Sequence, residues 1–252
     1  MARTTPAPES MRAVVLRAYD EDIESAIANV SVAERPMPVP RRGEVLVRME
    51  AAPVNPSDLL FLQGLYGVRK SLPAVPGWEG AGTVIASGGG FLAGRLRGRR
   101  VACGGQSEGD GTWAEYYVAA AMSCVPLHAD VDFEQGANSL VNPLTALGML
   151  ETIQRGKHPA VIQTAAVSQL GWMMVRLCRD AGIPLVNVVR REEQAASLRA
   201  AGASHVLDSS RPDFAEALKA VARELGATIA LDAVVGPMTG TLLAAMPEGA
   251  EV

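Results

Sequence analysis

Segments of strand and helix character alternate along the second half of this chain, from about residue 132 onward. The strands are short and apolar, and Gly182 and Pro184 mark one of the helix ends. Such alternation predicts right-handed βαβ units and a parallel sheet, and therefore an α/β fold. The expected strands are residues 160–164, 185–189, 205–207 and 228–234, and the expected helices are 142–150, 169–180, 192–201 and 213–225.

The first half has a different pattern, in which short β-type segments are broken by Gly and Pro. This spacing predicts a small, partly open β-barrel. We therefore expect a tail at residues 1–10, one domain at 11–130 and a second domain at 131–252. The tail contains Pro and Thr without an apolar run, which indicates disorder. The barrel strands are expected at residues 11–16, 44–50, 82–86, 100–102 and 113–118.

The turn after the first parallel strand is the expected binding site of an anion. It reads Thr-Ala-Ala-Val-Ser-Gln-Leu-Gly over residues 164–171, without the Gly-x-Gly-x-x-Gly pattern of dinucleotide folds. Gln169 stands where a glycine would let the backbone approach a diphosphate closely. Small residues nevertheless leave the first amides of the following helix open, and these amides bind anions. The alternative is an ordinary strand-to-helix turn.

Two arginines, Arg190 and Arg191, follow the second parallel strand. An acidic residue at this position favours NAD, whereas an arginine accommodates the 2′-phosphate of NADP. Arginine is planar and multidentate toward phosphate, so the sequence favours NADPH, with Arg190 as the main phosphate ligand. The alternative is that Glu192 and Glu193 neutralise the two arginines locally.

Tyr66 is the candidate for acid–base chemistry. It lies within a stretch rich in Gly and Pro, residues 55–80, which we expect to form a shaped surface loop. Loops on a rigid scaffold often carry catalytic groups. The alternative is that Tyr66 is a rim residue with its hydroxyl in water. Arg69 and Lys70 could meet a phosphorylated carrier such as coenzyme A, but we expect them to be solvated charges.

The same stretch resembles the zinc-independent branch of the medium-chain dehydrogenase/reductase superfamily. Tyr66 follows the pair Gln63-Gly64, as the proposed proton donor does in the 2-enoyl thioester reductases, and the related quinone reductases carry a similar Gly-x-Tyr. The resemblance implies a chaperonin-10-like barrel followed by a Rossmann-type sheet. It also implies that Tyr66 and Asn55 lie at the reacting centre, and that the cofactor contacts Asn142, Thr145, Val167, Ser168, Gln169, Leu170, Arg190, Arg191 and Glu192.

The resemblance also implies the reaction. Zinc-dependent members have a cysteine near the position of Asn55 and a His-Glu pair where this chain has Trp78-Glu79. No metal is therefore expected. The implied activity is NADPH-dependent reduction of the double bond of a 2-enoyl thioester, in which Tyr66 gives a proton. The alternatives are a quinone or enone reductase and a catalytically impaired NADPH-binding remnant.

Composition limits the partners. The net charge of −4 does not point to nucleic acid or to an anionic membrane, and no apolar run is long enough to span a bilayer. Three cysteines without a Cys-x-x-Cys pair are typical of a reduced, cytoplasmic protein. We expect a small-molecule substrate, and the resemblance implies a homodimer.

The chain ends where its relatives continue through further Rossmann strands. We therefore expect the strand at residues 228–234 to form an edge with unpaired backbone groups. The relatives' dimerisation strand and several of their cofactor loops belong to the part that this chain lacks.

Overall fold

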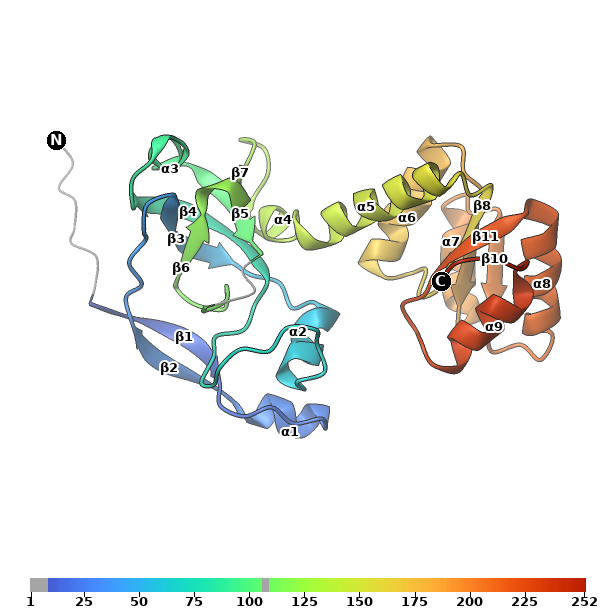
Figure 1. The fold of residues 1–252 in the computed structure, drawn as a ribbon, viewed down its shortest axis with the longest axis horizontal. Coiled ribbons are helices and arrows are strands. Elements are labelled where there is room, and N and C mark those ends of the chain that lie inside the picture. Colours follow the sequence, from blue (N-terminus) through green and yellow to red (C-terminus); the bar gives the residue numbers. More distant parts are fainter. Residues whose placement is uncertain (1–8, 106–108) are drawn as a thin grey trace. The chain divides into compact units, whose positions relative to one another are not determined.

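Two units make up the chain, residues 1–141 and 142–252, and each is considered by itself (Figure 1). The computed structural model describes residues 9–105 and 109–252. Most of the expected tail, residues 1–8, lies outside the described residues. Ser10 already belongs to a strand, in which it pairs with Pro36.

The first unit is built on a five-stranded antiparallel sheet of order β6-β3-β4-β5-β7 and a separate hairpin, β1-β2. Alternate residues of β3 and β5, such as Val45, Val47 and Val101, enter a core completed by α3. The strands are β1 (Ser10–Leu16), β2 (Val30–Pro36), β3 (Glu44–Ala51), β4 (Glu79–Ser87), β5 (Arg100–Gly104), β6 (Tyr116–Ala120) and β7 (Cys124–Pro126). The helices are α1 (Ile23–Ala28), α2 (Pro56–Leu62), α3 (Phe91–Leu96), η1 (Ala121–Ser123) and α4 (Phe133–Ala137).

The second unit contains a four-stranded parallel sheet of order β10-β9-β8-β11. Its strands are β8 (Ala160–Gln163), β9 (Leu185–Val189), β10 (His205–Asp208) and β11 (Ala227–Leu231). Its helices are α5 (Val141–Gly156), α6 (Gln169–Asp180), α7 (Glu192–Ala200), α8 (Phe214–Leu225) and α9 (Pro237–Ala245).

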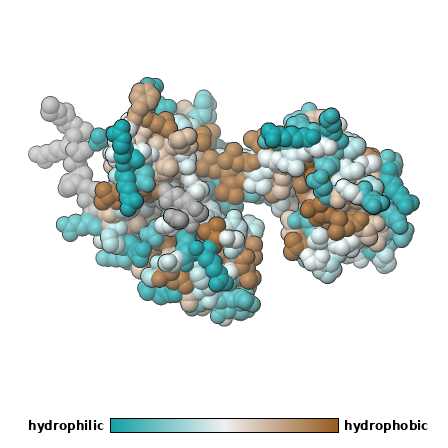
Figure 2. Space-filling view, in the orientation of Figure 1, coloured by the Kyte–Doolittle hydropathy of each residue, from teal (hydrophilic) through white to brown (hydrophobic). Residues whose placement is uncertain are grey.

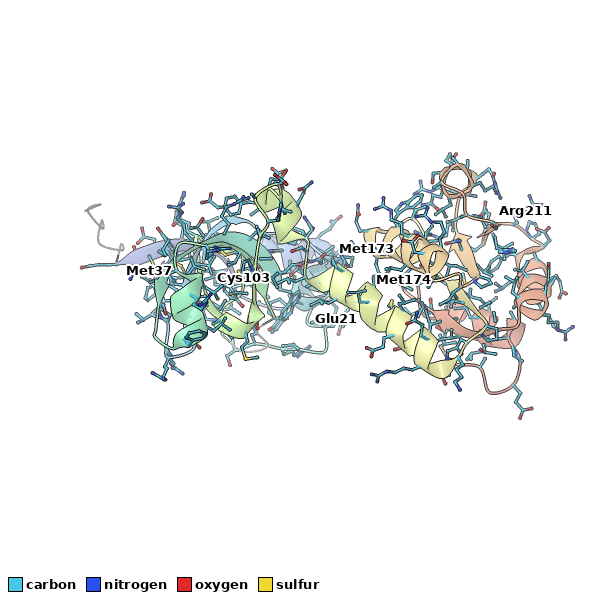
Figure 3. The ribbon with its side chains drawn as sticks, turned by 90° about the horizontal axis from the view of Figure 1, so that it is seen from above. Glu21, Met37, Cys103, Met173, Met174 and Arg211 are labelled. Atoms are coloured by element: carbon cyan, nitrogen blue, oxygen red, sulfur yellow. The ribbon has the colours of Figure 1, made fainter. Side chains whose placement is uncertain are left out.

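Both faces of this sheet are covered. Val161 of β8 faces a core with α5, α6 and α7, where Met174 of α6 is buried and Met173 packs at its border (Figure 3). Its neighbours Ala160 and Ile162 face the opposite core, formed with α8 and α9. This alternation confirms the predicted α/β fold, because side chains along a strand point to opposite faces.

A buried amide pair joins the two central strands. Gln163 and Asn187 are opposite each other on β8 and β9, and Gln163 Nε2 donates to Asn187 Oδ1 at 2.7 Å. Gln163 also donates to the carbonyl of Gly171, and Asn187 Nδ2 donates to the carbonyls of Leu185 and His205. All four side-chain N–H donations of this pair therefore reach an acceptor, which lowers the cost of burying the two amides.

Several details differ from the sequence-based expectation. Residues 56–62 form α2, although the whole stretch 55–80 was expected to be a loop. Trp113 and Ala114, expected in a sheet strand, pair instead with β1. The division between units falls after Val141 rather than near residue 130, because α4 packs on β4 and β5 of the first unit.

Helix α5 begins one residue before its expected start. The expectation was a helix at residues 142–150, but the helix begins at Val141. The amides of Leu140 and Val141 donate to Oε2 of Glu79, at 3.1 and 2.8 Å. A carboxylate from another part of the first unit therefore satisfies the helix start, and Pro143 remains within the first turn, where its missing N–H is tolerated.

The strand β11 was expected to have an unpaired outer edge, but this edge forms a short bridge with Glu251. Ala230 donates to the carbonyl of Glu251 at 2.9 Å, and the amide of Glu251 donates to the carbonyl of Thr228 at 3.0 Å. The strand ends at Leu231 rather than at residue 234, since the following residues turn around Asp232.

Candidate nucleotide groove and tyrosine loop

A cavity of about 500 Å³ lies in the second unit, at the carboxyl ends of the parallel strands. This is where open α/β sheets bind their ligands. Of the predicted cofactor residues, the cavity brings together Val167, Ser168 and Arg190. Its lining residues are Thr164, Ala165, Ala166, Val167, Ser168, Val188, Val189, Arg190, Gln194, Ser209, Ala233, Val234 and Met238.

The turn between β8 and α6 is shaped by two small residues. Ala165 has a φ of +48°, in the left-handed region that normally favours glycine. A Cβ atom at Gly171 would overlap the carbonyl oxygen of Ala166, so the first turn of α6 lies directly against the end of the strand. Ser168 caps the helix, and its Oγ accepts the Gly171 amide at 3.0 Å. Ser168 lines the cavity, so the N-terminus of α6, where the first amides have no intrahelical acceptor, begins beside it.

Asp232 holds the opposite wall of the groove. Its Oδ1 accepts the Thr164 hydroxyl at 2.9 Å and the amides of Val234 and Val235, and its Oδ2 accepts the Thr239 hydroxyl at 2.6 Å. Burial opposes ionisation of Asp232, but these hydrogen bonds outweigh it and lower the pKa of the carboxyl. Sequence reasoning missed Thr164 and Asp232 as site residues, although both lie at the ends of expected strands.

Arg190 lines the groove with an exposed side chain, and its amide donates to Oε1 of Gln194 at 3.1 Å. Glu192 does not neutralise it, because Glu192 Oε1 pairs with Arg199 Nη1 at 2.6 Å. Within the described part of the chain, neither Arg190 nor Arg191 takes part in an ion pair. A guanidinium without a counterion is thus left at the groove.

The other predicted cofactor residues do not line this cavity. Asn142 and Thr145 lie in the first turn of α5, and Arg191 precedes α7 as its N-terminal cap residue. Leu170 faces a separate small cavity with Gln163 and Met174, and Gln169 lines a hollow with Trp172 and Arg176. Ser209, Gln194 and Met238 line the groove instead. Ser209 directly follows β10, and this position at the carboxyl end of a parallel strand could have identified it as a groove residue from the sequence.

Tyr66 lies in the first unit, in the loop after α2. Its amide donates to the carbonyl of Leu60 at 3.1 Å. Its ring packs on Trp78, with 5.1 Å between centroids, and Trp78 in turn packs edge-on against Phe61 at 5.3 Å. Tyr66 remains 36% exposed. The aromatic contacts therefore fix the ring while leaving part of it accessible from solvent.

A buried polar cluster supports this loop. Asn55 Nδ2 donates to Oε1 of Glu79 at 3.0 Å, and the Asn55 amide donates to Oδ2 of Asp58 at 2.7 Å. All three side chains are buried. Asn55 was predicted from the resemblance to lie near the nicotinamide; in this unit its side-chain amide is directed to Glu79.

Lys70 was expected to be a solvated charge, and the structure corrects this. Its Nζ is buried, 4.9 Å from the Trp78 ring centroid and 5.7 Å from that of Phe61. Burial lowers the pKa of Lys70, whereas Asp110 and Asp58 act in the opposite direction. Arg69 is exposed and donates to the carbonyl of Gly64. Sequence could not reveal the burial of Lys70, because the aromatic rings that cover it come from separate elements.

Three buried polar atoms near Tyr66 lack a hydrogen-bond partner among residues 9–105 and 109–252: Lys70 Nζ, Trp78 Nε1 and Asp58 Oδ1. Burial raises the pKa of Asp58 to about 6, and the negative charge of Glu79 adds to this rise while the Asn55 amide opposes it. Unsatisfied buried groups in native proteins often mark functional sites. The carboxyl group of Asp58, in the buried polar cluster beside the tyrosine loop, therefore changes its protonation state near pH 6.

A membrane-spanning helix and a metal-binding cluster are both absent from the described residues. No helix there is long and apolar enough to cross a membrane. No three His, Cys, Asp or Glu side chains there gather in a way that could hold a metal ion.

Comparison with known proteins gives consistent relatives. The model of the alcohol dehydrogenase GroES-like domain matches residues 41–129. The mitochondrial enoyl-[acyl-carrier-protein] reductase of Arabidopsis thaliana is 34% identical over 185 residues, 68% of this chain and 46% of that protein. A putative NADPH:quinone reductase structure from Mesorhizobium loti has a TM-score of 0.90 at 36% identity, covering 98% of this chain and 74% of that one. A mycobacterial protein complexed with NADPH has a TM-score of 0.78 at 28% identity, covering 94% and 70%.

The chain therefore belongs to the zinc-independent branch of the medium-chain dehydrogenase/reductase superfamily, a family of oxidoreductases. This confirms the resemblance read from residues 55–80. The chain spans about half the length of the curated relatives that it matches.

Replacing Asp58 by Asn should stabilise the protein at neutral pH. The Asn oxygen keeps an acceptor for the Asn55 amide and removes a buried charge. Because the folded pKa of about 6 exceeds the unfolded value of about 3.9, the free energy of unfolding of the native chain falls as pH rises from about 4 to 6. We expect D58N to lack this fall and to be more stable by about 1–3 kcal/mol at pH 7.

Urea unfolding at several pH values measures this difference. Asp180→Asn, an exposed carboxylate on α6, is the matched control. Parallel pH profiles for D58N and the native chain would contradict the raised pKa.

Replacing Gly171 by Ala should destabilise the second unit by about 1–3 kcal/mol, because the new methyl group meets the Ala166 carbonyl oxygen. Gly148, which has open space around its Cβ position in α5, is the control. Gly148→Ala should stabilise the chain by about 0.5–1 kcal/mol. Urea unfolding compares the two, and equal stabilities would show that the turn is not tightly packed.

Proposed function

We propose that this chain is an NADPH-dependent reductase of activated carbon–carbon double bonds, with 2-enoyl thioesters as the substrate class and no metal. The observation that carries the proposal is the groove at the carboxyl ends of β8 to β11, with the guanidinium of Arg190 unpaired at its rim among the described residues. The relatives, which include reductases and a protein complexed with NADPH, support a nicotinamide cofactor.

The residues of the groove fit a dinucleotide. The close approach at Gly171 and the small side chains at Ala165 and Ser168 leave room for a diphosphate beside the first amides of α6. Arg190 would hold the 2′-phosphate, and Ser209 lines the same cavity. The cofactor, when bound, supplies the hydride that reduces the double bond.

Tyr66 would supply the proton. A tyrosine hydroxyl within hydrogen-bond reach of the reacting atoms can act as a general acid. The Trp78 ring packs against one side of the Tyr66 ring. Tyr66 remains partly exposed, and this exposure would let a substrate approach its hydroxyl. Apolar neighbours in the same cluster, such as Phe61 and Leu62, exclude water from behind the loop.

Reduction of quinones or simple enones is the second candidate. It is favoured by the high structural similarity to a protein named a putative NADPH:quinone reductase. An impaired form that binds NADPH without turnover is the third candidate.

Thermal unfolding with NADPH and with NADH, followed by NADPH oxidation with crotonyl-coenzyme A and with a benzoquinone, separates these three candidate functions. A cooperative unfolding transition that neither nucleotide shifts would refute the proposal.

Arg190→Ala should weaken NADPH selectively. Loss of a charged hydrogen bond to phosphate costs about 1.5–3 kcal/mol, so the NADPH dissociation constant should rise about 10- to 100-fold. NADH affinity should change less than about threefold, since NADH has no 2′-phosphate. Titration calorimetry measures both, with Arg223→Ala, an exposed arginine on α8, as control. Equal losses for the two nucleotides would remove Arg190 from 2′-phosphate recognition.

Tyr66→Phe should lower turnover by about 100-fold or more, because general acid catalysis contributes about 10²–10⁴-fold. NADPH affinity should be unchanged. Initial-rate kinetics and titration calorimetry measure the two effects, and Tyr116→Phe on β6 is the control. Turnover equal to that of the native chain would exclude Tyr66 as the proton donor.

A further inference from the structure

One end of the first unit is assembled around the backbone of Gly43. Its amide donates to the carbonyl of Gly89 at 2.9 Å, and its own carbonyl accepts the Ala121 amide at 2.9 Å. The amide of Gly88 also donates to the carbonyl of Glu44 at 3.0 Å. Three segments distant in sequence, before β3, before α3 and at η1, are therefore held together at one surface.

Large apolar side chains project from these three segments. Val39 is 81% exposed, Phe91 82% and Met122 89%, and Leu92 beside them is 43% exposed. Figure 2 shows hydrophobic side chains next to hydrophilic ones at the α3 end of this unit. Single exposed apolar residues are common, but four on α3, η1 and the loop before β3, segments joined by hydrogen bonds, indicate a patch that binds a partner. We call these residues the apolar tips.

Arginines lie on the segments that carry the apolar tips or directly beside them, and Arg95 lies over the Phe91 ring at 5.4 Å. Glu44 is the one acidic residue in the segments 37–44, 88–100 and 121–126, and it accepts the Arg41 amide. None of the ion pairs formed within the described ranges involves the surrounding arginines. This arginine ring consists of Arg41, Arg42, Arg95, Arg97 and Arg99, all exposed.

We propose that the apolar tips and the arginine ring form a docking face for the surface of an anionic phospholipid bilayer. The tips suit the boundary between headgroups and acyl chains, and guanidinium groups bind lipid phosphates. A second copy of the chain would bring two arginine rings together, which like-charge repulsion opposes. The net charge of the whole chain, −4, pointed away from membranes, but the fold collects positive charge in one place.

This docking face is independent of the proposed reductase activity. It lies on α3, η1 and the loop before β3, whereas Tyr66 follows α2 and the groove belongs to the second unit. Its test therefore needs no substrate or cofactor.

Cosedimentation of the full chain with vesicles tests the proposal. We expect binding to phosphatidylcholine–phosphatidylserine vesicles, weak binding to phosphatidylcholine alone, and weakening with added salt. The substitutions R95A, R97A and R99A should each weaken binding about fivefold. The pair F91S and M122S should abolish it even at low salt.

Matched controls lie in the second unit: Arg176→Ala, Arg223→Ala and Leu243→Ser change exposed residues of the same types and should leave binding unchanged. Thermal unfolding of every variant confirms that it is folded. Equal binding to neutral and anionic vesicles, or equal effects of control and patch substitutions, would overturn the proposal. So would a chain that ignores vesicles but self-associates, or binds polyglutamate, through these residues.

Discussion

The buried carboxylate of Glu79 is the interaction on which the first unit depends most. A buried charge is tolerated only when donors surround it, and Glu79 receives the side-chain amide of Asn55 and the backbone amides of Leu140 and Val141. These donors come from the middle of the unit's sequence and from its end. Trp78 directly precedes Glu79, the first residue of β4, so the bonds of the carboxylate also hold the ring against which Tyr66 packs.

The turn at the groove of the second unit contains a single glycine, Gly171. Gly171 is the position where a side chain would meet backbone, whereas the left-handed conformation is taken by Ala165. A non-glycine residue there costs roughly 1 kcal/mol or more, which the surrounding contacts must offset. Asp232 supplies part of that support by linking Thr164 to the chain after β11. The sequence lacks the Gly-x-Gly-x-x-Gly motif at this turn, but the structure still has a groove there.

Local patterns predicted the second unit well: the helix at 169–180 and the strand at 185–189 have the expected bounds. Helix α2 was missed although Asn55, Pro56 and Asp58 form a good helix start, because the following glycines dominated the interpretation. The burial of Lys70 and the clustering of arginines could not be predicted, because both depend on contacts between segments far apart in sequence. The fold by itself does not test the chemical roles of Tyr66, Asn55 and Arg190, which remain predictions.

The bonds at Gly43 use main-chain atoms alone. Side chains displayed by the three joined segments can therefore be exchanged without disturbing the barrel, and neither the tyrosine loop nor the groove takes part in them. Mutation can vary what this end of the molecule recognises while the groove keeps its geometry.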